Sequence, residues 1–210
     1  GYGDINMARA LEVSSNIGVS HIIDKYYGKE PERYVKGLYR IGIHEDLKLP
    51  LVGYLPPRIR MPEKNKRGQY LNWSKTALPW MSIGYETQIA PINTVTFYNA
   101  IANNGKMMRP RFIKKVMKNG KTIAEYPPQV IKERIAKPKA IETMQTILEH
   151  VVSQGLGRKA GSPLFKVAGK TGTAQVADQF GGCHSGITRY WLSFAGYFPA
   201  NDPKYSCIVC

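Results

Sequence analysis

A lysine, two threonines and a glycine stand together in the segment Lys170-Thr171-Gly172-Thr173. Lys170 can place a fixed cation beside a group that gains negative charge. Thr171 and Thr173 offer hydroxyl donors to a carboxylate, and the backbone N–H of Thr173 can donate to an oxyanion. Gly172 has no side chain, so a substrate can pair with the strand at close range. Together these groups suit acyl transfer.

A hydroxyl and an amide stand together in a second motif, Ser14-Ser15-Asn16. The Ser14 hydroxyl can relay a proton, and the Asn16 amide can orient an amide of the substrate. Taken alone, each motif has a more ordinary interpretation, because Ser-Ser-Asn is common as a helix cap and Lys-Thr-Gly-Thr as a turn or a phosphate-contacting loop. Their order favours the catalytic interpretation, since the first lies between predicted helices and the second on a strand that can form a sheet edge.

Hydrophobic periodicity and turn residues predict a largely helical first part and a stranded end. Asp4 is expected to cap the first helix, and Asn119-Gly120 to turn a hairpin. The proline-rich, basic segment from Leu49 to Pro79 is expected to be a long irregular loop. A second helix is expected to end at Gly28, and further helices are expected from Pro31 to Gly42, Pro91 to Asn103 and Pro138 to Gly155. The expected strands are Phe112 to Lys118, Lys121 to Tyr126, Lys166 to Gln175, Tyr190 to Pro199 and Tyr205 to Cys210. The last three strands predict an antiparallel meander, and the whole predicts an α+β protein.

The composition indicates a globular protein and limits the classes of function. Of the 210 residues, 43% are hydrophobic, and the formal net charge is +15. Such a charge fits a solvated basic surface, or attraction to an anionic polymer, an anionic membrane face or nucleic acid. The sequence has neither a zinc-finger spacing nor an aromatic RNA-binding signature, so nucleic acid is not expected as a partner. No apolar stretch is long enough to span a bilayer.

The cysteines and histidines do not form a metal-binding pattern. Three cysteines, Cys183, Cys207 and Cys210, are too few for a disulfide scaffold. Cys183 and His184 are adjacent and have no further ligands nearby, which makes a poor metal site. We therefore expect neither a metal nor another cofactor.

The two motifs, in this order, resemble part of the signature of penicillin-binding proteins and β-lactamases, which consists of Ser-x-x-Lys, Ser-Asp-Asn and Lys-Thr-Gly. Nearly the whole chain resembles the transpeptidase domain of a class B penicillin-binding protein, with Ser14-Ser15-Asn16 as the second motif and Lys170-Thr171-Gly172 as the third. Further blocks similar to the family are 10–19, 82–86, 102–110, 167–175 and 193–200. The resemblance implies the family's α+β fold, with a helical subdomain and a three-stranded antiparallel C-terminal sheet, and a single incomplete domain over residues 1–210.

The resemblance also implies an activity: a serine D,D-transpeptidase that cross-links peptidoglycan stem peptides and is trapped by β-lactams. In that reaction Ser14 would assist proton transfer, Asn16 would hold the substrate amide and Lys170 would supply charge. Thr171 and Thr173 would bind the substrate carboxylate and the oxyanion, and Gly172, also substrate-binding, would let the substrate approach the strand closely.

One element of the family signature is absent. The family's nucleophile is the serine of Ser-x-x-Lys, and no serine of this chain is followed by lysine three positions later. We therefore expect a fragment that is inactive by itself and lacks the upstream Ser-x-x-Lys segment, the early strands and the closing helix. The resemblance places the whole protein at the extracytoplasmic (periplasmic) face of the cytoplasmic membrane, held there by a segment outside this chain. The Ser-Ser-Asn form is more similar to division-type than to elongation-type enzymes, which implies division proteins as partners.

Two other classes of function remain open. A β-lactam sensor or β-lactamase of the same fold would carry the same motifs, although the blocks around Ser82 and Asn103 argue against it. A non-catalytic basic module that binds an anionic polymer would account for the charge. Hydrolysis of a β-lactam by the completed protein would favour the first alternative, and salt-dependent polymer binding without any β-lactam reaction would favour the second.

Overall fold

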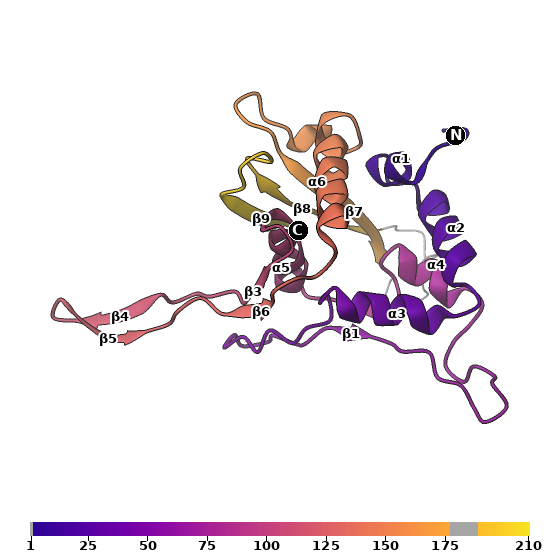
Figure 1. Ribbon diagram of the computed structural model, residues 1–210, viewed down its shortest axis with the longest axis horizontal. Coiled ribbons are helices and arrows are strands. Elements are labelled where there is room, and N and C mark those ends of the chain that lie inside the picture. Colours follow the sequence, from indigo (N-terminus) through magenta and orange to yellow (C-terminus); the bar gives the residue numbers. More distant parts are fainter. Residues whose placement is uncertain (1, 177–188) are drawn as a thin grey trace.

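The computed structural model describes residues 2–176 and 189–210 and shows a mixture of helices and strands (Figure 1). The helices are α1 Met7–Glu12, α2 Asn16–Tyr27, α3 Pro31–Arg40, α4 Ala77–Ser82, α5 Pro91–Ala102 and α6 Pro138–Ser153, with a 3₁₀ turn at Arg158–Ala160. The strands are β1 Arg58–Ile59, β2 Thr87–Gln88, β3 Met107–Met108, β4 Lys115–Lys118, β5 Lys121–Glu125, β6 Val130–Lys132, β7 Ala168–Val176, β8 Arg189–Phe198 and β9 Tyr205–Val209. The α+β class is confirmed.

A three-stranded antiparallel sheet with the order β7-β8-β9 forms the end of the chain. β7 and β8 pair without a register shift from Ala168↔Tyr197 to Val176↔Arg189. β8 continues to β9 from Phe198↔Tyr205 to Phe194↔Val209, which confirms the predicted meander. β7 is an outer strand, so within the described residues no strand pairs with its edge away from β8.

Two facing glycines let β7 and β8 approach closely. Gly169 pairs with Gly196 across the two strands. A Cβ atom on Gly196 would lie 2.3 Å from the carbonyl oxygen of Ala168, and one on Gly169 would lie 2.4 Å from Cζ of Phe194. The Phe194 ring occupies the space over the glycine pair, so no side chain fits at either position.

α5 and α6 pack against the sheet and enclose the main hydrophobic core. Most apolar residues of α6 are buried, with Val151 fully inaccessible and Leu148 nearly so. Full burial of each such side chain contributes about 1.5–3 kcal/mol. The buried members of this core are Ala100, Ile101, Met107, Ile135, Ile141, Leu148, Ala168 and Tyr197. This core fixes β7, and hence the third motif, against α6.

A smaller core joins α3 to the long segment that follows it. Val35, Ile59 and Met81 are its buried members. The segment predicted as an irregular loop contains only the two-residue strand β1 and one isolated bridge, Lys64↔Tyr70, before α4 begins. Regular structure returns at Ala77, just before the predicted end of the loop at Pro79.

The start of α1 corrects one prediction, because Asn6 and not Asp4 caps this helix. Oδ1 of Asn6 accepts a hydrogen bond of 2.8 Å from the backbone N–H of Arg9. A cap residue must directly precede the first helical residue, which is Met7, so Asp4 comes too early in the chain.

The hairpin of β4 and β5 projects from the body of the molecule as a separate arm (Figure 1). Its turn is the predicted Asn119-Gly120 pair, with φ values of 49° and 74°. Two successive left-handed residues are the pattern of a type I′ turn. All four residues of β4 are exposed, so the arm adds little to either core.

Candidate active site

Ser14 lies just after α1 in a backbone conformation that usually belongs to glycine. Its φ is 52°. The N–H of Ser15 donates to the carbonyl oxygen of Ala10 at 2.8 Å, and the N–H of Ser14 donates to that of Leu11 at 3.1 Å. These two bonds form the Schellman pattern of a helix end, in which the left-handed residue is most often glycine. A side chain in this region costs about 1–2 kcal/mol, so the packing around Ser14 has to hold its backbone in this conformation.

The next two residues of the motif begin α2. Ser15 is the N-cap, and its Oγ accepts a hydrogen bond of 3.1 Å from the N–H of Gly18. Asn16 is the first residue of the helix, and its side chain is exposed. A Cβ on Gly18 would lie 3.1 Å from Cβ of Ala10, so glycine lets α2 turn closely against α1. The motif therefore ends one helix, caps the next and starts it.

Lys170 reaches from β7 to Ser14, although 156 positions separate them in the sequence. Nζ of Lys170 donates to Oγ of Ser14 at 2.7 Å and to the carbonyl oxygen of Thr171 at 2.9 Å. Burial lowers the pKa of the Lys170 ammonium below its ordinary value, because the charged form loses hydration. A larger fraction of Lys170 is therefore neutral than of an exposed lysine, which suits a group that exchanges a proton with a hydroxyl.

The edge of β7 that faces away from β8 presents a row of backbone N–H and C=O groups. The N–H of Gln175 donates away from β8 to the hydroxyl oxygen of Tyr85 at 3.1 Å. The carbonyl oxygen of Thr171 accepts from Lys170. Alternate residues of an antiparallel strand direct both backbone groups to the same edge. Thr173, midway between Thr171 and Gln175, therefore presents its N–H on this edge, where an oxyanion donor was predicted.

Gly172 lies between Thr171 and Thr173, and the space beside it is bordered by the neighbouring strand β8. A Cβ at this position would lie 2.6 Å from Oγ of Ser193, the residue paired with Gly172 on β8. The predicted reason for the glycine was close approach of a substrate to the strand. In the structure, the space left by the missing Gly172 side chain lies next to the Ser193 hydroxyl.

Tyr85 touches the site, and the sequence did not predict this contact. Its ring packs edge to face on Trp80, with centroids 5.1 Å apart, while its hydroxyl accepts from Gln175. The block 82–86 was recognised as similar to the family, but 90 positions separate Tyr85 from Gln175. Spacing along the chain gives no signal for such a contact.

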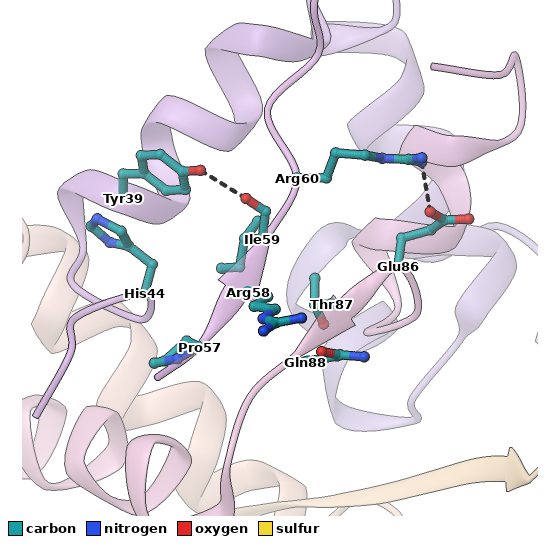
Figure 2. Close-up of a pocket in the computed structure, with 9 residues that line it drawn as sticks. All are labelled: Tyr39, His44, Pro57, Arg58, Ile59, Arg60, Glu86, Thr87 and Gln88. Carbon is teal, nitrogen blue, oxygen red and sulfur yellow. Dashed lines mark hydrogen bonds and ion pairs between the residues drawn. The ribbon is translucent and has the colours of Figure 1, made fainter. Parts of the chain in front are cut away.

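A cavity of about 690 Å³ lies away from both motifs, between the end of α3 and the β1–β2 pair (Figure 2). The hydroxyl of Tyr39 donates to the carbonyl oxygen of Ile59 at 2.7 Å, and Arg60 forms an ion pair of 2.6 Å with Glu86. These polar groups satisfy one another, and no residue of either motif lines the cavity. Of the predicted site residues, Ser14 and Lys170 meet elsewhere, beside β7.

The sequence predicted neither a metal site nor a membrane-spanning stretch. Within residues 2–176 and 189–210, no cluster of three or more histidine, cysteine or acidic side chains is placed to hold a metal ion. Cys183 and His184 lie outside the described residues. Among the described helices, none has the length and apolar character needed to cross a membrane.

Comparison with known proteins agrees with this fold. Residues 1–210 match the family described as "penicillin binding protein transpeptidase domain", and the chain belongs to this family. It is 29% identical over 204 residues to penicillin-binding protein PbpB of Mycolicibacterium smegmatis, covering 91% of this chain and 29% of that protein. It is 25% identical over 219 residues to the peptidoglycan D,D-transpeptidase FtsI homolog of Mesostigma viride, covering 96% of this chain and 34% of that protein.

A solved structure shows the same fold. The crystal structure of penicillin binding protein 3 from Mycobacterium tuberculosis in complex with aztreonam has a TM-score of 0.74 and 28% identity, covering 97% of this chain and 44% of that one. The expected family and fold are thereby confirmed. The chain spans about a third or less of the length of these curated relatives.

Proposed function

We propose that this chain is the part of a serine D,D-transpeptidase that carries the second and third motifs, and that the whole protein cross-links peptidoglycan stem peptides. The observation that carries the proposal is the 2.7 Å hydrogen bond between Lys170 and Ser14, beside the edge of β7 with which no strand pairs among the described residues. A relative named as a peptidoglycan D,D-transpeptidase and a similar structure that holds aztreonam support it.

In this proposal the site residues have separate tasks. The extended stem peptide pairs with the β7 edge, and the N–H of Thr173 donates to the oxyanion as the carbonyl of the penultimate D-Ala is attacked. The hydroxyls of Thr171 and Thr173 bind the terminal carboxylate. Asn16 orients the substrate amide. Ser14 and Lys170 pass a proton to the nitrogen of the departing D-Ala, and an amine from a second stem peptide then takes the acyl group.

The attacking serine belongs to a Ser-x-x-Lys segment outside the 210 residues, because no serine within them has lysine three positions later. The proposal therefore expects the 210-residue chain to be unreactive by itself. It also places the whole protein on the extracytoplasmic side of the cytoplasmic membrane, where it acts with division proteins and is inhibited by β-lactams.

Labelling with a fluorescent penicillin tests this function. We expect no covalent adduct on a denaturing gel with the 210-residue chain, and a stable adduct when the chain is produced together with a Ser-x-x-Lys segment from the PbpB relative. Lys170→Met in the completed protein should lower the labelling rate by roughly a hundredfold or more, as loss of a general acid–base group does. Stable labelling of the chain alone would contradict the assignment of the nucleophile. Continuous hydrolysis of the penicillin by the completed protein would indicate a β-lactamase instead.

A further inference from the structure

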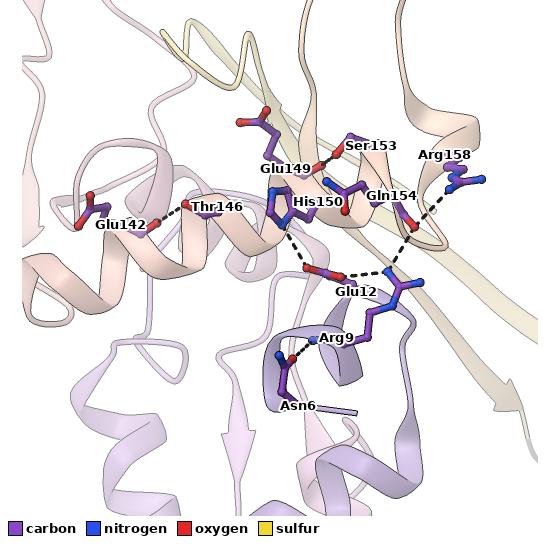
Figure 3. Close-up of polar contacts among 10 residues, drawn as sticks. All are labelled: Asn6, Arg9, Glu12, Glu142, Thr146, Glu149, His150, Ser153, Gln154 and Arg158. Carbon is purple, nitrogen blue, oxygen red and sulfur yellow. Dashed lines mark hydrogen bonds and ion pairs between the residues drawn. The ribbon is translucent and has the colours of Figure 1, made fainter. Parts of the chain in front are cut away.

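Glu12 lies close before Ser14 and is held in a polar network between α1 and α6 (Figure 3). Its side chain is only 9% exposed. Oε2 accepts a hydrogen bond of 3.0 Å from Nη1 of Arg9, and Oε1 lies 3.2 Å from Nδ1 of His150 on α6. A buried carboxylate is costly unless both oxygens have partners, and here both do.

The backbone of Glu12 is held by the residues that directly follow α6. Its carbonyl oxygen accepts a hydrogen bond of 3.1 Å from the N–H of Leu156. A Cβ on Gly155 would lie 2.3 Å from this oxygen, so only glycine allows the two segments to meet. Nη1 of Arg9 also lies 3.4 Å from the carbonyl oxygen of Gln154. Side chain and backbone together fix Glu12 against α6.

α6 also packs along β7, the strand that carries Lys170. One helix therefore holds both halves of the candidate site: the strand through apolar contacts and the Ser14 segment through Glu12. The neighbours of Ser14 must also keep its backbone in the left-handed region, which a serine does not favour by itself. A small shift of α1 away from α6 would separate Oγ of Ser14 from Nζ of Lys170.

The other carboxylates drawn on α6 have partners of their own. Glu149 forms an ion pair of 2.8 Å with Lys166, and Glu142 forms one of 2.9 Å with Lys139. Glu142 is well exposed and is not in contact with α1 in the network of Figure 3. Glu142 therefore provides a matched control for Glu12.

We propose that Glu12 is a positioning residue that holds the Ser14 hydroxyl against Lys170, with Arg9 and His150 as its anchors. Glu12 acts through Ser14 and does not itself reach the substrate. That Glu12 positions Ser14 is argued from the contacts above. That this positioning matters for catalysis rests on the proposed function.

The positioning role is tested on the 210-residue chain by following the Lys170 side chain with NMR during a pH titration. Ser14→Ala removes an acceptor from the ammonium group, so it should lower the pKa of Lys170 by about one unit in the otherwise unchanged chain. In a Glu12→Ala background, where Ser14 is already displaced, the same substitution should leave this pKa nearly unchanged. His150→Ala, which removes a half-exposed anchor without removing the carboxylate, should weaken the coupling in the same direction.

The control variant Glu142→Ala should retain the full effect of Ser14→Ala on Lys170. Melting temperatures of all variants show whether each is folded at the temperature of the titration. Undiminished coupling in both Glu12→Ala and His150→Ala would overturn the inference. An equal loss of coupling in Glu142→Ala would overturn it too, because the effect would then not be specific to Glu12.

The catalytic meaning is measured separately, in the chain completed with a Ser-x-x-Lys segment. Glu12→Ala should lower the rate of acylation by penicillin roughly ten- to a hundredfold, the usual effect of a misplaced reacting group, while Glu142→Ala should not. Loss of the NMR coupling with an unchanged acylation rate would keep the positioning role and refute the catalytic role of Ser14. A completed protein that does not react with penicillin at all would refute the proposed function and leave the NMR result standing.

Discussion

At the scale of single residues, the motif Ser14-Ser15-Asn16 shows how three consecutive residues can hold different positions. Ser14 ends α1 in a left-handed conformation and contacts Lys170, Ser15 caps α2, and Asn16 starts it. A helix cap and a catalytic motif are therefore not competing interpretations here. Ser15 serves as the cap, and the break between the helices turns the Ser14 side chain towards Lys170 on β7, where we propose that the reaction takes place.

Replacing Ser14 by glycine and by alanine separates its backbone cost from its hydroxyl. Both variants lose the bond to Lys170, but only glycine relieves the strain of a φ of 52°. We expect the free energy of unfolding of Ser14→Gly to exceed that of Ser14→Ala by about 1 kcal/mol, measured by urea denaturation. Equal stability of the two variants would show that residue 14 does not hold this conformation in solution.

Lys170 should make the stability of the chain depend on pH in a defined direction. Its pKa is lowered in the folded chain, so the unfolded chain binds this proton more tightly and stability rises with pH. The cost is fully present below the lowered pKa and is relieved as the pH rises from there to the ordinary value of 10.5. Urea denaturation of the wild type and of Lys170→Met across this range should show a relative gain for the wild type. A parallel pH dependence of the two would contradict this prediction.

At the scale of helices and strands, the sequence predicted the elements whose signals are local. Pro91 and Pro138 both open helices, the Asn119-Gly120 pair turns a hairpin, and the C-terminal strands form a meander. The cap of α1 was assigned to the wrong residue, because Asp4 and Asn6 are both good caps and only the true start of the helix decides between them.

The site itself was predictable only in part. Ser14 and Lys170 were paired by resemblance, and the structure brings them together. The contact of Glu12 with His150 spans 138 positions and that of Tyr85 with Gln175 spans 90, and neither follows from any periodicity. Such contacts depend on how the helices and the sheet pack, which spacing along the chain does not specify.

The close approach of β7 and β8 leads to a prediction about the stability of glycine variants. Gly169→Ala places a Cβ against the Phe194 ring and the strand backbone, and should destabilise the chain by about 1–3 kcal/mol. Gly37, within α3, is the matched control, since a Cβ there would meet nothing within 4 Å. Gly37→Ala should instead stabilise by about 0.5–1 kcal/mol, because alanine favours a helix interior. Thermal unfolding of both variants measures this contrast, and the same sign for both would refute it.

At the scale of the whole molecule, the body and the β4–β5 arm are different kinds of structure. The body is held by two hydrophobic cores, whereas the arm is a two-stranded ribbon whose β4 residues are all exposed. Isolated hairpins of this kind are marginally stable in water. The stability of the fold and of the candidate site should therefore not depend on the arm.

Replacing residues 115–125 by a short glycine-containing turn tests this separation. We expect the free energy of unfolding to change by no more than about 0.5 kcal/mol, and the coupling of Ser14 to Lys170 to be unchanged. Urea denaturation and the Lys170 titration are the measurements. A large loss of stability would show that the arm packs against the body in solution.

The hydrogen bond from Gln175 to Tyr85 also limits the length of the exposed strand edge. The Tyr85 ring lies at this end of the row of outward-facing backbone groups. In the proposed function, a stem peptide that pairs with β7 at Thr171 and Thr173 therefore has to end before residue 175 or bend away from the strand there.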